Sequence, residues 1–229
     1  MASTPARLEP IAETGIPHWV APGTSTWSSL VGRLDNALAN LAEAAEAGRA
    51  SGASGYLVTD WGDHGHLQGP SLSYGPLLYG GAVSWGLDAN RDVDLVPLLD
   101  DRVFHDRTHR LGGALDALGR VWRRTGRRAV NCSPLHAAAF PDQTHLVTGR
   151  PDPAALAEVV EVIDDRCLAI DASCPTGGDA EAIRNELIVG ARLARLGAVN
   201  LLARGDAPHP GPGPLDHRAL LPSALEESW

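Results

Sequence analysis

The segment 59–66 carries the side chains best suited to chemistry. It places two carboxylates, an indole and two imidazoles close together, spaced by glycines: Asp60, Trp61, Asp63, His64 and His66. Folding gains nothing from this crowding, because desolvating a carboxylate is costly unless it is paired. A sugar would account for all these residue types, since it offers an apolar face to an aromatic ring and hydroxyl groups to carboxylates. The segment therefore predicts a carbohydrate-binding loop.

Two alternatives use the same residues. The two aspartates could accept main-chain N–H groups and cap a turn, with Trp61 simply packed. A small metal-dependent hydrolase could instead hold zinc or non-haem iron through Asp60, Asp63, His64 and His66. The His-Gly-His loop lacks the i, i+4 helical placement of stronger zinc motifs, so the sequence favours a sugar over a metal.

Other clusters are interpreted as structural. Ser25 has neither a Gly-x-Ser-x-Gly elbow nor an evident base, so its turn is expected to cap the helix that follows. His105 and His109 have metal-binding spacing, but no third ligand is evident. The aromatic side chains of the predicted helix over 74–87 are assigned to the core: Tyr74, Tyr79 and Trp85.

Two predicted strands position the candidate site. The runs 16–21 and 56–59 read as strands, and a helix is predicted between them over 32–47, where leucines recur at helical spacing. In a parallel βαβ unit, the loops after both strands emerge on the same side of the sheet. Trp27, in the loop after the first strand, is therefore expected to join Trp61. Ligand sites of α/β barrels and open α/β sheets lie at this edge.

The rest of the chain reads as helical. Residues 1–15 are predicted to form a loop, and the Pro/Gly-rich stretch 205–229 reads as linker-like. Further helices are expected over 106–125, 152–165 and 179–197. The predicted organisation is a barrel-like part with its following helices (1–140), a helical extension (141–204) and a tail (205–229).

The scarcity of strands is informative. Only two convincing strands occur in 229 residues, whereas a (β/α)8 barrel needs eight and an isolated two-stranded sheet is marginal. The sequence therefore predicts either that something outside this chain completes the sheet or that the chain is a fragment of a larger protein.

Composition limits the function classes. The formal net charge of −9 argues against a nucleic-acid partner. No apolar stretch suits a membrane span, and residues 1–10 lack the apolar region of a signal peptide. The three cysteines fit neither a disulfide framework nor a zinc motif, which favours a cytoplasmic setting without cofactor or structural metal: Cys132, Cys167 and Cys174.

Four stretches together resemble the C-terminal end of the catalytic barrel of bacterial glycoside hydrolase family 20, the β-N-acetylhexosaminidases. They are Ala-Pro-Gly-Thr-Ser-Thr-Trp (21–27), Gly-Arg-Leu-Asp-Asn-Ala (32–37), Thr-Asp-Trp-Gly-Asp-His-Gly-His (59–66) and Gly-Gly-Ala-Val-Ser-Trp (80–85). The likeness covers about residues 16 to 140. It implies an α/β fold: the last strands and helices of a (β/α)8 TIM barrel, followed by a helical C-terminal region.

The resemblance also implies roles for the site residues. Trp61 would form one wall of the pocket for a terminal N-acetylhexosamine, Trp27 a second wall, and Asp63 would accept hydrogen bonds from sugar hydroxyls. Asp60, His64 and His66 would line the same mouth.

The family's chemistry is substrate-assisted and uses a consecutive Asp-Glu pair, unlike the usual two-carboxylate scheme. No Asp-Glu dipeptide occurs in this sequence. No catalytic residue is therefore assigned, and a missing N-terminal barrel portion is the expected source of the acid. The alternative is a non-catalytic carbohydrate-binding or assembly module that pairs with another polypeptide.

Overall fold

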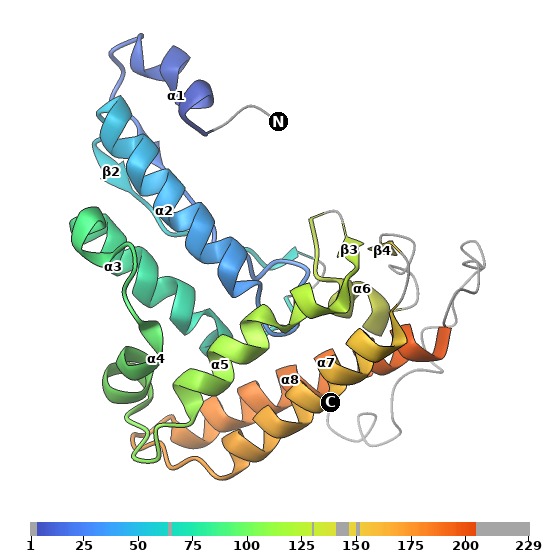
Figure 1. Cartoon of the computed structure of the whole chain (residues 1–229). Helices are drawn as coiled ribbons and strands as arrows, with labels where there is room; N and C mark the ends of the chain where they lie inside the picture. Colours follow the sequence, from blue (N-terminus) through green and yellow to red (C-terminus); the bar gives the residue numbers. More distant parts are fainter. Residues whose placement is uncertain (1–3, 64–65, 130, 141–146, 150–151, 205–229) are drawn as a thin grey trace, which may run out of the picture.

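The computed structural model describes residues 4–63, 66–129, 131–140, 147–149 and 152–204 (Figure 1). Helices account for 65% of the structure and strands for 6%. The elements, with η marking 3-10 or π-helical turns, are α1 (Thr4–Ala12), β1 (Trp19–Val20), α2 (Leu34–Ser51), β2 (Gly55–Tyr56), η2 (Pro70–Ser73), α3 (Tyr74–Asn90), α4 (Leu95–Leu98), η3 (Leu99–Phe104), α5 (Leu111–Arg120), η4 (Val121–Thr125), β3 (Arg128–Ala129), α6 (Pro134–Ala139), β4 (Val147–Thr148), α7 (Pro153–Asp171) and α8 (Ala180–Arg204).

The predicted parallel βαβ unit is confirmed. β1 pairs in parallel with β2, with Trp19 opposite Gly55 and Val20 opposite Tyr56. An isolated parallel bridge between Gly23 and Thr59 prolongs the pairing toward the loops that follow. α2 connects the two strands and packs on them. The close fit of Gly48 of α2 against the side chain of Val20 joins this helix to the sheet.

The predicted partial (β/α)8 barrel is wrong. Within the described residues, the other sheet is an antiparallel pair, β3 with β4, and no third parallel strand joins β1 and β2. After β2 the chain turns into η2 and then runs through helices up to η4. The core is accordingly a helical one, in which a single buried cluster runs from Leu30 to Leu201.

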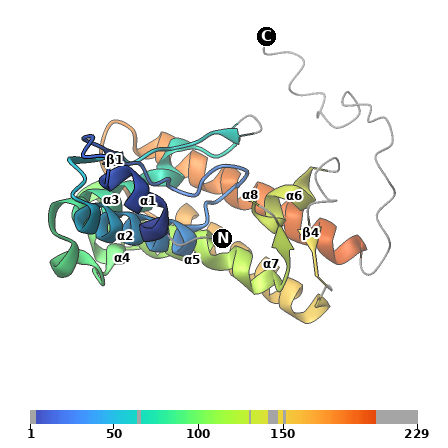
Figure 2. The same ribbon diagram turned by 90° about the horizontal axis from the view of Figure 1, so that it is seen from above.

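Five helical segments pack together in that core. α8 packs along α7 and α6, while α5 and η4 pack on α7. Figure 2 shows the βαβ unit and α3 toward one end of the molecule, with α6 and α7 toward the other. The contact between α8 and its neighbours depends on small residues. A Cβ on Gly197 would collide with the carbonyl oxygen of Leu135 in α6, and one on Gly190 would lie 2.7 Å from the carbonyl oxygen of Leu30.

Several local expectations need correction. Residues 4–12 form α1 where a loop was expected, and α5 begins at Leu111 and not at 106. The reason for the later start is that Asp106 shapes a turn before α5. Its carboxylate accepts hydrogen bonds from the main-chain N–H groups of Arg110 (2.9 Å) and Leu111 (3.1 Å). The predicted cap at Asp152 is confirmed, because its side chain accepts from Ala154 and Ala155 at the start of α7.

Asp106 also connects distant parts of the chain. Its second oxygen accepts from Thr108 and from the main-chain N–H of Cys174 at 2.8 Å, in the loop between α7 and α8. Burial alone would raise the pKa of this carboxyl group. The hydrogen bonds from Arg110, Cys174 and Thr108 outweigh burial and lower the pKa to about 2.

We therefore expect Asp106→Asn to destabilise the protein. A carboxyl group whose pKa is lower in the folded than in the unfolded state stabilises the fold above its unfolded pKa of about 4, and here contributes roughly 2 kcal/mol at neutral pH. This contribution is lost as the pH falls from about 4 to about 2. Urea unfolding across this range should show a weaker pH dependence in the variant. Asp92→Asn, on the exposed surface, is the control and should behave like the wild type.

The close packing of α8 on α6 predicts that a larger residue at Gly197 lowers stability. Gly197→Ala should lower the free energy of unfolding by about 1–3 kcal/mol, because the added methyl group must push α8 away from α6. Gly113→Ala is the matched control: its Cβ would meet nothing within 4 Å, so this change within α5 should be neutral or stabilise by up to about 1 kcal/mol. Equal losses of stability in both variants would contradict the close-packed contact.

Candidate functional site

The Gly23–Thr59 bridge aligns the two loops that carry the candidate residues. The main-chain N–H of Thr24 donates to the carbonyl oxygen of Thr59 at 3.0 Å, and that of Thr59 donates to the carbonyl oxygen of Pro22 at 2.9 Å. Segments 24–29 and 60–63 therefore leave the carboxyl ends of the two parallel segments side by side. This is the arrangement that the sequence predicted for the loops.

Asp60 is a carboxylate held in place at the surface. Its Oδ1 accepts hydrogen bonds from the buried hydroxyl groups of Thr24 and Thr26, the latter at 2.5 Å. Its Oδ2 accepts from the buried hydroxyl group of Ser73 at 3.0 Å. Three segments far apart in the sequence thus fix one exposed acceptor. Such a group is ready to accept hydrogen bonds from a ligand without first being ordered.

Trp61 is exposed. Its side chain keeps 58% of its surface accessible, while its indole N–H donates to the hydroxyl oxygen of Thr59 at 2.8 Å. The ring is therefore anchored at one edge and open to solvent, as a stacking surface for a ligand requires.

Trp27 lies close to the Gly23 end of the bridge. Its ring covers Gly23 so closely that a Cβ there would be 2.7 Å from Cζ3, and that same Cβ would lie 3.5 Å from the hydroxyl oxygen of Thr59. The indole N–H donates to the side chain of Asn131 at 2.7 Å, and the Arg33 guanidinium carbon lies 4.9 Å from the ring centroid. Only glycine at position 23 permits this approach. Trp27 thus lies near the bridge at Gly23 and Trp61 at Thr59, with Asp60 as the next residue.

A buried polar layer supports Trp27 from behind. Arg33 is buried, and its Nε donates to the carbonyl oxygen of Ser25 at 3.4 Å. Burial lowers the pKa of this guanidinium, and nearby Cys132 and Asp35 offset part of that effect. The predicted helix cap at Ser25 is wrong, because α2 has its N-cap at Arg33 and no side chain caps it. The buried Ser25 hydroxyl group instead accepts from the Asn36 side chain at 2.7 Å.

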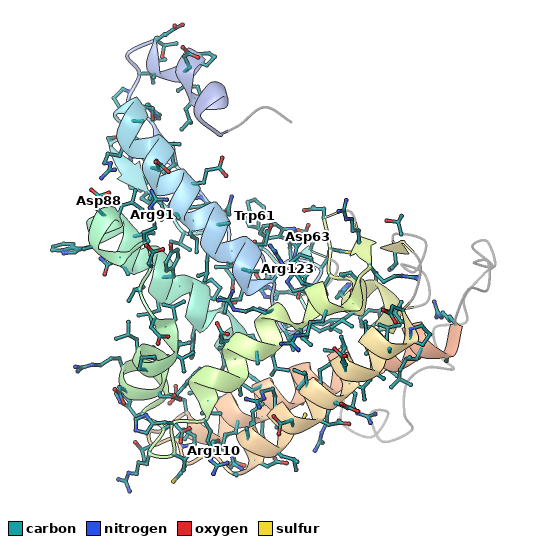
Figure 3. The ribbon with its side chains drawn as sticks, in the orientation of Figure 1. Trp61, Asp63, Asp88, Arg91, Arg110 and Arg123 are labelled. Atoms are coloured by element: carbon teal, nitrogen blue, oxygen red, sulfur yellow. The ribbon has the colours of Figure 1, made fainter. Side chains whose placement is uncertain are left out.

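The remaining candidates extend the surface beyond Trp61. Asp63 and His66 are exposed, and the His66 ring packs against Gly62. His64 lies outside the described residues, so its predicted role stays a prediction. Within the described part of the chain, no three histidine, cysteine, aspartate or glutamate side chains gather as a metal site would require. Figure 3 shows Trp61 and Asp63 beside α2, well apart from Asp88 and Arg91.

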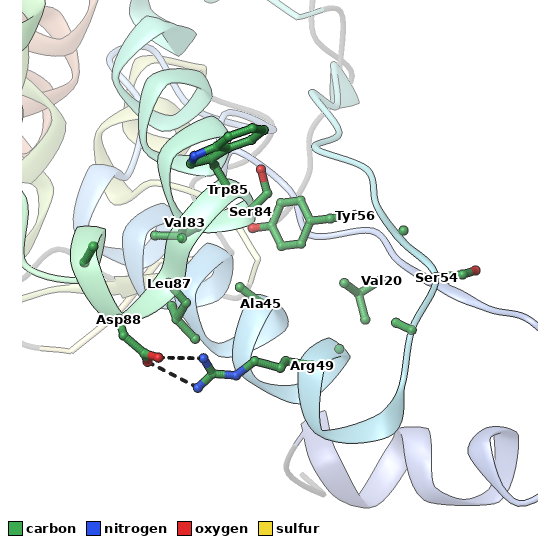
Figure 4. A pocket seen from close by; sticks show the side chains of 15 residues that line it. Val20, Ala45, Arg49, Ser54, Tyr56, Val83, Ser84, Trp85, Leu87 and Asp88 are labelled. Carbon is green, nitrogen blue, oxygen red and sulfur yellow. Dashed lines mark hydrogen bonds and ion pairs between the residues drawn. The ribbon is translucent and has the colours of Figure 1, made fainter.

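A separate pocket of about 610 Å³ lies at the opposite end of the strands (Figure 4). Val20, Tyr56 and the kinked end of α3 form its walls, and the Arg49–Asp88 ion pair, with N–O distances of 2.8 and 3.2 Å, lies at its edge. None of the predicted site residues lines this pocket.

The assignment of Trp85 to the core is wrong. This side chain is 93% exposed at the rim of the pocket. Trp85 follows Tyr79 by six residues, which on a helix of 3.6 residues per turn places it about 240° away from the face that carries buried Tyr79 and Val83. Gly86 then interrupts α3 with non-helical angles (φ −160°, ψ 86°). The side-chain amide of Asn90 donates hydrogen bonds to the carbonyl oxygens of Ala82 and Gly86, and these bonds stabilise the kink. Gly86 itself was the sequence signal for this interruption.

Comparisons of the chain with protein-family models, with curated proteins and with solved structures found no match. The resemblance to glycoside hydrolase family 20 therefore stays a prediction. None of the helices in the described residues combines the length and apolar character that crossing a lipid bilayer requires.

The close approach of Trp27 to Gly23 is testable. Gly23→Ala should displace the indole of Trp27, because the new methyl group would occupy the position of the ring edge. The indole N–H signal of Trp27 should move in the NMR spectrum as its hydrogen bond to Asn131 breaks. Gly81→Ala, where a Cβ meets nothing within 4 Å, is the matched control and should leave that signal in place.

Proposed function

We propose that the surface formed by Trp27, Asp60, Trp61 and Asp63 binds a terminal N-acetylhexosamine. The observation that supports this most directly is the placement of two indoles near one bridge, Trp27 at Gly23 and Trp61 at Thr59, with a fixed, exposed carboxylate as the next residue. A pyranose needs such a combination of apolar ring and oriented acceptor. The choice of an N-acetylhexosamine rests on the family 20 resemblance of residues 16–140.

Each side chain has a separate part in this proposal. Trp61 presents its exposed ring face to the apolar face of the sugar. Asp60 accepts a hydrogen bond from a sugar hydroxyl group through the second lone pair of its Oδ2, since Oδ1 already accepts from Thr24 and Thr26 and Ser73 uses one lone pair of Oδ2. Asp63, three residues farther along the chain, is exposed and extends the acceptor surface. Trp27, whose ring lies against Gly23, forms a second wall of the site.

The proposed activity of this chain is binding and not hydrolysis. Cleavage of a glycosidic bond needs a positioned acid to protonate the leaving oxygen. The sequence lacks the consecutive Asp-Glu pair that the resembled family uses. Asp60 does not substitute for it, because both of its oxygens already accept hydrogen bonds from hydroxyl donors. A chromogenic N-acetylglucosaminide should therefore be bound but not cleaved.

Two substitutions test the proposal. Trp61→Ala and Asp60→Asn should each weaken binding of N-acetylglucosamine at least about tenfold, which corresponds to about 1.4 kcal/mol, because one removes the stacking face and the other an anionic acceptor. Binding is measured by NMR titration, with glucose as a comparison ligand that lacks the acetamido group.

Trp85→Ala is the matched control, because it removes an equally large exposed indole at the other end of β1 and β2. It should leave the affinity unchanged. Loss of binding in this control, with full binding by Trp61→Ala, would show that the sugar binds near Trp85 and not at the proposed surface. Absence of any binding by the wild-type protein would refute the proposed function.

A further inference from the structure

Among the residues that the structure describes, the helices cover one face of the sheet of β1 and β2. The side chains of Val20, Tyr56 and Val58 face the helices: Val20 meets Gly48 of α2, and Val58 meets Gly80 of α3. Side chains alternate along a strand, so Trp19 and Leu57 belong to the opposite face. They remain 62% and 50% exposed. Parallel sheets in folded proteins are normally covered on both faces.

The outer edge of β2 has free main-chain groups. The N–H groups of Leu57 and Thr59 donate inward, to the carbonyl oxygens of Val20 and Pro22, both at 2.9 Å. The intervening residues Tyr56 and Val58 therefore direct their N–H and C=O groups outward, as alternate residues of a strand do. No described residue is a hydrogen-bond partner of these outward groups.

The two edges of the sheet differ in their protection. β1 is preceded by Pro17, which has no N–H group to offer another strand. The stretch 52–59, which contains β2, has neither a proline nor a charged residue. Natural edge strands are usually protected by charges, prolines or bulges. The edge of β2 is thus the one open to strand pairing.

We propose that β2 pairs in an antiparallel manner with β2 of a second copy of this chain, around a twofold axis at Leu57. In this register, Tyr56 of each copy lies opposite Val58 of the other and exchanges both main-chain hydrogen bonds with it. Leu57 lies directly opposite its own counterpart, as a non-hydrogen-bonded pair with closely spaced side chains. The result is a four-stranded sheet with the order β1–β2–β2–β1.

The second copy is the occupant that the edge fits. A twofold axis places the same patch on both sides, so donors and acceptors at positions 56 and 58 match without any other sequence. The absence of charge over 52–59 also matters, because each copy carries a net charge of −9 and like charges at the contact would oppose association. This pairing does not depend on the proposed sugar binding.

Analytical ultracentrifugation tests the pairing. The wild-type protein should sediment with the mass of two chains, and Leu57→Lys with the mass of one, because two ammonium groups would then face each other at the axis. Leu168→Lys is the matched control: that leucine, on α7, is 69% exposed, and its replacement should leave the dimer intact. A wild-type protein of one-chain mass at every concentration, or a Leu57→Lys variant of two-chain mass, would overturn the proposal.

Hydrogen exchange of the wild-type protein gives a test without any substitution. The amides of Tyr56 and Val58 should exchange more slowly as protein concentration rises, whereas the amides of Leu57 and Thr59, bonded within one chain, should not change. Concentration-independent exchange at 56 and 58 would rule out this edge, even if the protein dimerised through another surface.

Discussion

The parallel alignment of 18–24 with 54–59 is the constraint on which the candidate site depends. Four main-chain hydrogen bonds join these segments: Ser54 to His18, Leu57 to Val20, Thr59 to Pro22 and Thr24 to Thr59. The last two place Asp60 and Trp61 beside the loop that contains Trp27. A shift of one residue in this register would turn every side chain to the other face, so Asp60 would lose its three hydroxyl donors.

The candidate site combines a rigid base with an open upper surface. Thr24, Thr26 and Ser73 are buried, and their hydroxyl groups donate hydrogen bonds to Asp60. In the same loop as the two threonines, Ser25 and Ser28 adopt positive φ angles of 58° and 47°. Such angles are costly for residues other than glycine and persist where surrounding contacts fix them. The polar residues of this loop therefore orient the carboxylate of Asp60 and the indole of Trp27.

The local pattern of the sequence predicted the βαβ unit and the meeting of its two loops, because leucine spacing in α2 and the short apolar runs are local signals. The barrel could not be predicted correctly from a motif resemblance. The positions after β2 adopt helices such as α5, whose buried leucines Leu111, Leu115 and Leu118 belong to the helical core and which packs on α7 and α2 and not on a sheet. The assignment of Trp85 to the core failed for another reason: it followed the apolar residue type, whereas helical periodicity places position 85 away from the face of buried Tyr79 and Val83. The hydrogen bonds of Asp60 with Thr24 and Ser73 depend on tertiary contacts that no sequence spacing encodes.

The helical core explains how so small a sheet can persist. A two-stranded sheet alone is marginal, but α2 belongs both to the βαβ unit and to the buried cluster that continues into α8. Leu34 and Leu41 of α2 are buried in that cluster, and Asp35 in its first turn contacts Trp122 and Arg123 of η4. The strands are thus held by a helix whose own position is fixed by the rest of the molecule. Because the fold does not depend on further strands, the edge of β2 can stay open without loss of the native structure and is available for pairing.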